Sequence, residues 1–151
     1  MFLNRAKNTT ARDFCARVPV PFFVDGEWVT GDHEAIPVLD PATGQAICAV
    51  GSAAESQVDR AVLAARRSFD NQHWAGMRPD QRAIALQRWA DLVERDQTVL
   101  SELETIQTGK PIRESRIDVA RALDGIRFYA AAARNNYGDL VNVSPKHHTY
   151  I

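Results

Sequence analysis

The 151-residue sequence has few cysteines, no long apolar run and no excess of either charge, and each shortage excludes a class of protein. Its two cysteines, Cys15 and Cys48, are too few for the disulfide framework of a small secreted domain, so we expect a reducing, cytoplasmic compartment. The longest apolar stretches fall far short of the roughly 20 residues that cross a bilayer, which excludes a membrane-spanning chain. With 18 Lys and Arg against 19 Asp and Glu, a charge-driven nucleic-acid binder is excluded as well.

The composition that remains is that of a soluble globular chain, with 45% apolar and 25% charged residues. The first 17 positions are an exception, because they contain four basic residues and a single acidic one, Asp13. This pattern resembles a transit peptide only faintly, and a solvated tail is the simpler interpretation. We therefore predict a flexible tail over residues 1–20 and folded structure from residue 21 onward.

Two β-hairpins are expected first, at residues 22–29 and 36–50. In the first, Asp25-Gly26 lies between two short apolar runs and suits the positive φ angles of a two-residue type I′ turn. In the second, Pro41 fixes φ within the connecting turn and Gly44 can supply a left-handed position.

Four amphipathic helices are expected next, because apolar residues then recur every three or four positions. The first begins at the capping-box pattern Ser52–Glu55 and ends near Gly76. The third ends at Gly109, which can form a left-handed cap ahead of Pro111. The apolar stripes of the four helices run over about residues 52–76, 79–96, 99–109 and 119–138.

The last residues, 140–151, have the composition of strands broken at Ser144-Pro145. The sequence stops inside the second of these runs, where a domain rarely ends, so we expect an unfinished strand pair and a chain that is part of something larger.

A search for reaction chemistry finds no complete active site. No Gly-x-Gly-x-x-Gly turn is present, and Lys110, which follows a glycine as in a P-loop, is followed by Pro111 instead of Ser or Thr. The histidines are isolated or adjacent, which does not suit metal ligation. Cys48 lies in an apolar run with no nearby base, so we interpret it as a small core residue. We assign no catalytic and no cofactor-binding residue to this chain.

Four sequence strings carry a family resemblance: FFVDGEW, LDPATGQAI, SAAESQVDRAVLAAR and LETIQTGKPIRES. Any one of them can arise by chance, but all four in this order, between Phe22 and Ile151, resemble the N-terminal region of the aldehyde dehydrogenase superfamily. The strings DPATGQ, LETIQTGKP and RFYAAAARNNYGDLV are similar to those of betaine-aldehyde and semialdehyde dehydrogenases in particular.

The resemblance implies an α/β fold in which residues 21–151 are a partial region that packs around the cofactor domain and leads into oligomerisation strands. It also implies NAD or NADP as the cofactor of the full-length protein, with the rest of the subunit and further copies of it as partners. In the family a cysteine attacks the aldehyde, an asparagine steadies the oxyanion, hydride passes to the nicotinamide and a glutamate activates water. None of these motif positions is in the sequence, so the catalytic domain is absent from it and no cofactor is expected for this chain alone. The run Gly44–Cys48 is one residue too long for the family's Gly-Gln-x-Cys string.

Two departures from the family pattern are visible. Relatives often have Asp at the position of Gln107, where it binds a monovalent cation together with the backbone carbonyls of positions matching Val38 and Leu39. The resemblance thus implies a degenerate cation site at these three residues. Relatives also tend to have Ser or Thr where Arg78 stands, so the helix that begins at Pro79 lacks its usual side-chain acceptor, a local loss of about 1 kcal/mol.

Two interpretations remain open at this point. In the first, the chain is the N-terminal part of an NAD(P)-dependent aldehyde dehydrogenase that converts an aldehyde to a carboxylic acid through a cysteine thiohemiacetal, and is inactive alone. In the second, it is a non-enzymatic helical interaction module derived from the same family, which uses its apolar helix faces to bind a partner.

Overall fold

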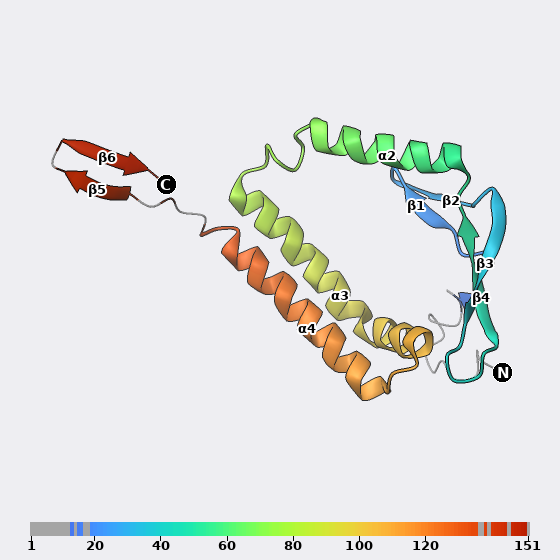
Figure 1. The fold of residues 1–151 in the computed structure, drawn as a ribbon. Helices are drawn as coiled ribbons and strands as arrows, with labels where there is room; N and C mark the ends of the chain where they lie inside the picture. The colour runs from blue at the N-terminus through green and yellow to red at the C-terminus, as the bar shows by residue number, and fades with distance from the viewer. Residues whose placement is uncertain are drawn as a thin grey trace.

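The computed structural model describes residues 13, 15, 16, 19–135, 138, 140–144 and 146–150. Their fold is α/β (Figure 1). The strands are β1 (Phe22–Val24), β2 (Glu27–Val29), β3 (His33–Leu39), β4 (Ala46–Ser52), β5 (Leu140–Ser144) and β6 (His147–Tyr150), and the helices are α2 (Glu55–Asp70), α3 (Pro79–Thr108) and α4 (Ile112–Ala132).

Each of the three sheets in this part of the chain has two antiparallel strands, in the pairs β1-β2, β3-β4 and β5-β6. The first hairpin is confirmed, since Asp25 and Gly26 have φ angles of 55° and 86° between β1 and β2. The second is confirmed as well, with Gly44 at φ 68° in its turn. In β4 the pairing shifts register, because Leu39 is opposite Ala46 whereas Val38 is opposite Cys48.

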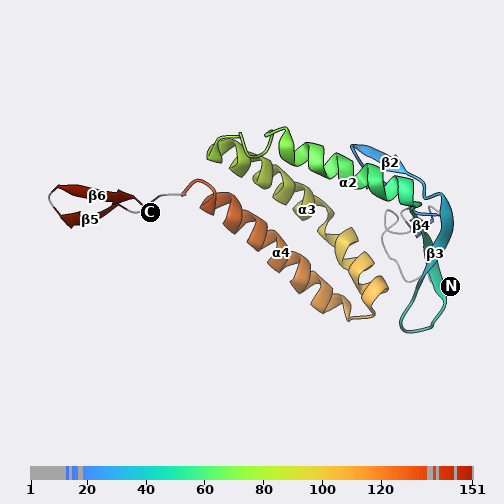
Figure 2. The same ribbon diagram turned by 45° about the horizontal axis from the view of Figure 1, so that its top comes forward.

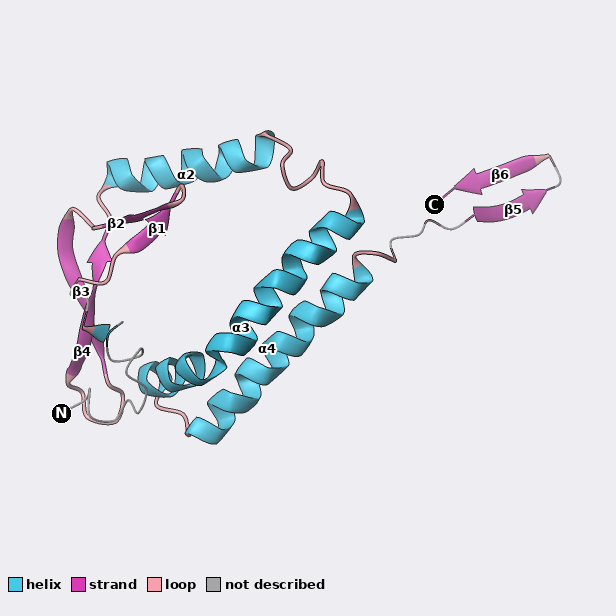
Figure 3. Cartoon of the chain, turned by 180° about the vertical axis from the view of Figure 1, so that it is seen from behind, coloured by secondary structure: helices cyan, strands magenta, loops and turns pink. Residues whose placement is uncertain are grey.

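The prediction of four helices is wrong: the described residues contain three helices with defined bounds, and the expected second and third are one helix, α3. No Gly or Pro occurs between Pro79 and Gly109, so nothing in the sequence stops the helix at the expected boundary near Asp96. The axis of α3 does change direction in its last third (Figures 1 and 3). There the Ser101 hydroxyl donates a hydrogen bond to the carbonyl of Gln97 at 2.7 Å, a contact that often bends a helix.

The helix ends differ from expectation at one place and agree at another. The capping box does not form at Ser52, because that residue belongs to β4 and pairs with His33. Instead α2 has Ala54 as its N-cap, and the Gln57 side chain accepts a hydrogen bond from the Ala54 N–H at 3.0 Å. The predicted stop at Gly109 is confirmed, with φ 77° at the C-cap of α3.

Helices α3 and α4 lie side by side and antiparallel, and they make the most extensive contact in the structure (Figures 1 and 3). Most of the buried residues on the two helices are small, with Leu123 and Ile106 the two large ones; the small ones are Ala83, Ala90, Ser101, Ser115 and Ala130. The hairpin β5-β6 stands apart from all three helices (Figure 2). None of the described helices combines the length and the apolar character needed to cross a bilayer.

The segment predicted to be a flexible tail, residues 1–20, is described only in part. Within the described part, Val20 forms a parallel bridge with Val50 of β4, and Cys15 is buried against Ile106 of α3. The strand pair expected after residue 140 is present as β5 and β6, whereas Tyr137, predicted on the last helix, lies outside the described residues.

Candidate functional site

The turn between β3 and β4 meets the junction of α3 and α4, and a cavity of about 320 Å³ lies between them. Its lining residues come from both segments: Asp40, Ala42, Thr105, Ile106, Gly109, Lys110 and Pro111. The approach is close, because a Cβ added to Gly109 would lie 3.3 Å from the Cβ of Pro41. Glycine at this position therefore serves both the left-handed backbone and the contact between the two segments.

The turn itself is organised by Asp40, which is only 3% exposed. Its carboxylate accepts a hydrogen bond from the Ala42 N–H at 2.9 Å, and its backbone carbonyl accepts one from the Gly44 N–H at 2.7 Å. Asp40 engages in further interactions as well. Such local bonds are the reason Asp is common at the start of a turn, and here they hold the turn in the shape that meets α3.

Lys110 is a positively charged residue at this corner, and it forms ion pairs with two carboxylates. Its Nζ lies 2.7 Å from Glu104 Oε1 on α3 and 2.8 Å from Asp118 Oδ2 on α4. The hydrogen bonds to Asp118 and Glu104 raise the pKa of Lys110, and the same contact lowers the pKa of Asp118. Lys110 therefore joins the ends of two helices, which supports its interpretation as part of a helix stop over that of a phosphate ligand.

The three residues of the implied cation site lie on the two segments that meet at this corner. Val38 and Leu39 end β3 directly before Asp40, and Gln107 is in the last turn of α3 with its side chain exposed. The amide of Gln107 can supply one neutral oxygen and no charge, so these residues lack the carboxylate that would favour a cation. The described residues contain no group of three or more His, Cys, Asp or Glu that could hold a metal ion. The cation site stays a prediction.

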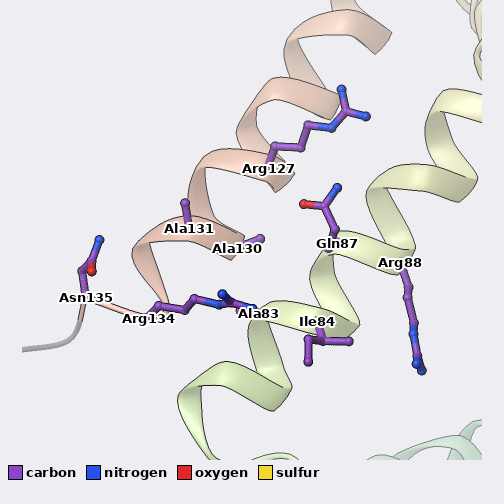
Figure 4. A pocket seen from close by; sticks show the side chains of 9 residues that line it. All are labelled: Ala83, Ile84, Gln87, Arg88, Arg127, Ala130, Ala131, Arg134 and Asn135. Carbon is purple, nitrogen blue, oxygen red and sulfur yellow. The ribbon is translucent and has the colours of Figure 1, made fainter.

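A second cavity, of about 470 Å³, lies between the first half of α3 and the end of α4 (Figure 4). It is lined by Ala83, Ile84, Gln87, Arg88, Arg127, Ala130, Ala131, Arg134 and Asn135. The Arg134 side chain crosses toward α3, whereas that of Arg88 points away from the groove (Figure 4). Arg127 is paired with Glu94 of α3 at 2.7 Å. The three guanidinium groups do not converge, so the groove does not assemble an anion site.

The two cysteines do not resemble catalytic nucleophiles. Burial raises the pKa of Cys48, and the pKa of Cys15 is raised first by burial and then by the neighbouring Cys48. A thiol with a raised pKa is mostly protonated and weakly nucleophilic at neutral pH. The proximity of the two cysteines was missed by sequence reasoning, because no spacing rule relates positions so far apart in the chain.

The sequence model of the "Aldehyde dehydrogenase family" matches residues 28–151. Human mitochondrial aldehyde dehydrogenase is 34% identical over 152 residues, which cover 96% of this chain and 28% of that protein. Betaine aldehyde dehydrogenase of Bacillus subtilis is 31% identical over 121 residues, which cover 80% of this chain and 25% of that protein.

Among solved structures, the NAD+ complex of aldehyde dehydrogenase from Bacillus cereus is similar with a TM-score of 0.82 and 28% identity, over 95% of this chain and 29% of that one. Betaine aldehyde dehydrogenase of Staphylococcus aureus with NAD+ has the same fold over 99% of this chain, at a TM-score of 0.81 and 24% identity. The chain thus spans less than a third of the length of these proteins.

Proposed function

Because the chain belongs to the aldehyde dehydrogenase family, we propose that it is the N-terminal part of a subunit that oxidises an aldehyde to a carboxylic acid with NAD+ or NADP+. One observation carries the proposal: the family match over residues 28–151 coincides with a fold likeness at a TM-score of 0.82. The solved Bacillus cereus and Staphylococcus aureus relatives are NAD+ complexes, which supports a nicotinamide cofactor for the complete protein. A cytoplasmic location is proposed from the small number of cysteines.

In a complete subunit the resemblance implies a cysteine that attacks the aldehyde, an oxyanion-steadying asparagine and a water-activating glutamate, with hydride passing to the nicotinamide. The 151 residues contain none of these motif positions. Cys48, the cysteine closest to a family-like string, is partly buried and has a raised pKa, so it is a poor substitute. We propose that the chain by itself neither oxidises aldehydes nor binds the cofactor, and that its role is architectural.

The exposed apolar side chains support an architectural role. Phe69 on α2 is 70% exposed, Trp89 on α3 is 55% exposed and Tyr129 on α4 is 67% exposed. Each large apolar side chain left in water forgoes roughly 1.5 to 3 kcal/mol of burial, so three helices with such faces favour a covering partner. We propose that this partner is the remainder of an aldehyde dehydrogenase subunit.

We propose that the hairpin β5-β6 is the start of the oligomerisation strands that the resemblance implies. Its position away from the helices leaves both edges of a two-stranded sheet without a neighbouring strand among the described residues (Figure 2). A two-stranded sheet is marginal by itself, and unpaired edges favour association with another strand. We propose that the complete protein is a homo-oligomer that uses this hairpin.

The first experiment tests the isolated chain. Purified protein is assayed for NADH and NADPH formation with a panel of aldehydes and is titrated with both cofactors. We expect no turnover and no saturable binding. Clear turnover would mean that an active site exists within these 151 residues and would overturn the architectural role.

The second experiment tests the family role directly. Residues 21–151 replace the corresponding segment of the Bacillus cereus enzyme, whose structure this chain matches, and the chimera is assayed for aldehyde oxidation. We expect a soluble chimera with measurable activity. Leu123→Asp in the same chimera places a charge at a position that is 6% exposed and should abolish solubility. As a matched control, Thr98→Asp changes an exposed polar position on α3 and should leave solubility unchanged. A chimera that folds but has no activity would contradict the proposed role.

A further inference from the structure

The only two cysteines of the sequence, far apart in the chain, come together in one part of the fold. Cys15 is 6% exposed and packs against Ile106 of α3, and Ile47, the residue directly before Cys48, packs against the same small cluster. Both cysteines are free thiols, and Cys48 is the less buried of the two. This proximity is independent of the aldehyde dehydrogenase chemistry, which uses neither residue.

A backbone bridge holds the two segments in register. The Val20 N–H donates to the carbonyl of Ala49 at 2.8 Å, and the Gly51 N–H donates to the carbonyl of Val20 at 2.9 Å. These bonds fix the chain that follows Cys15 alongside the strand that carries Cys48, in a parallel bridge at Val20 and Val50. The position of Cys15 beside β4 therefore does not depend on side-chain packing alone.

The irregularity in β4 also affects Cys48. Because Ala46 and Cys48 both pair with successive residues of β3, Ile47 is an extra residue between them. Such a bulge interrupts the strict alternation of side chains and can turn two successive residues toward the same side of a strand. Ile47 contacts the Cys15 cluster, and the neighbouring Cys48 is close enough for its charge to raise the pKa of Cys15. Cys15 and the strand segment that carries Cys48 therefore lie in one part of the fold.

We propose that Cys15 and Cys48 are a modification site, at which a hydroperoxide converts the two thiols into an intrachain disulfide. In the first step the less buried Cys48 thiol is oxidised by hydrogen peroxide to a sulfenic acid, with release of one water. In the second step the Cys15 thiol attacks that sulfur, the S–O bond breaks, the S–S bond forms and a second water leaves. The two thiols lose two protons and two electrons, and the peroxide takes them up.

The disulfide would link Cys15, which packs against Ile106 of α3, covalently to β4. A thiol reductant returns both cysteines to the reduced form, which is the resting form in a reducing compartment. Since burial keeps both thiols protonated, the reaction is slow and needs sustained exposure to peroxide. Closing a loop between such distant positions restricts the unfolded chain, so the disulfide favours the folded position of Cys15 beside β4.

The test is a peptide map of the full chain after treatment with hydrogen peroxide at low protein concentration, with remaining thiols blocked by N-ethylmaleimide. Trypsin cuts after Arg12, Arg17 and Arg60, and no other Lys or Arg lies between residues 12 and 60. A disulfide would therefore join the peptide of residues 13–17 to that of residues 18–60. We expect this linked pair as the main oxidised product, and its loss after treatment with dithiothreitol.

Two controls separate an intrachain bond from its alternatives. In a mixture of isotopically labelled and unlabelled chains, the linked pair should carry one label or the other, and pairs with mixed labels would overturn the proposal. The variants Cys15→Ser and Cys48→Ser should each leave one blockable thiol and give no linked intrachain peptide. Oxidation of either cysteine to a sulfinic acid without any linked peptide would also overturn the proposal.

Discussion

Replacing Gly109 tests whether the corner between the β3-β4 turn and the α3-α4 junction is built as the structure describes. Gly109 has φ 77° at the C-cap of α3, a conformation that strains any residue with a Cβ. An added Cβ would also lie 3.3 Å from the Cβ and 3.4 Å from the Cγ of Pro41. The substitution Gly109→Val therefore introduces two separate penalties at one position.

The size of each penalty can be separated with a matched variant. The left-handed backbone alone costs a residue with a side chain roughly 1–2 kcal/mol. Gly26 has φ 86°, and nothing lies within 4 Å of a Cβ added there, so Gly26→Val carries the backbone strain without a tertiary contact. The contact with Pro41 adds part of the roughly 1–3 kcal/mol typical of overpacking. We expect a loss of about 2–3 kcal/mol for Gly109→Val and about 1–2 kcal/mol for Gly26→Val.

The measurement is the free energy of unfolding in urea, made in the chimera with the Bacillus cereus enzyme so that the proposed partner of the apolar faces is present. A third variant, Gly109→Asn, should lose less than Gly109→Val because asparagine tolerates the left-handed region. Equal losses at positions 109 and 26 would refute the Pro41 contact. No loss at Gly109 would refute the left-handed cap itself.

Three further predictions follow from other parts of the structure. Arg78→Ser should raise the free energy of unfolding by about 0.5–1 kcal/mol in urea titrations, because Arg78 is the N-cap of α3 with no side-chain cap and its exposed pair with Asp80 contributes little. The lowered pKa of Asp118 means that its ion pair with Lys110 stabilises the fold above the ordinary carboxyl pKa of 3.8 and is lost as the pH falls below it. Unfolding of Lys110→Met should accordingly vary less with pH in this acidic range than that of the wild type, and an unchanged pH dependence would contradict the pairing. The isolated chain should self-associate through its apolar faces, and light scattering that showed a monodisperse monomer with one cooperative thermal transition would instead favour the helical interaction module.

The β-turns and the C-terminal end of α3 were predictable from the sequence because they depend on residues that are neighbours in the chain. The positive φ angles at Asp25 and Gly26 follow from the residue pair itself, and the end of α3 follows from Gly109 ahead of Pro111. The α/β class and the family followed from the order of four such local strings. These features depend on a few neighbouring residues and little on what packs against them.

The predictions that were wrong concern features that depend on more than the neighbouring residues in the chain. Ser52 has the spacing of a helix cap, but its backbone pairs with His33, and a strand partner is invisible to a local pattern. The boundary expected near Asp96 came from a change in the apolar stripe, whereas the helix continues because no residue stops it. The implied cation site shares this dependence: the structure brings the segments of Leu39 and Gln107 to one corner, and their ligand geometry stays a prediction.

The apolar stripes of the helices predict surfaces to be buried, whereas the structure leaves Val58, Val62 and Phe69 of α2 exposed. If α3 and α4 formed a self-contained core, the large residues of the stripes would fill the seam between them. The fully buried residues of the pair are mainly alanine and serine, and Trp89 and Tyr129 remain more than half exposed. Small residues allow two helices to approach closely, which leaves the large side chains to face outward on both. The pair is thus one layer with apolar residues left to cover, which is the form expected of a region that packs against the remainder of an aldehyde dehydrogenase subunit.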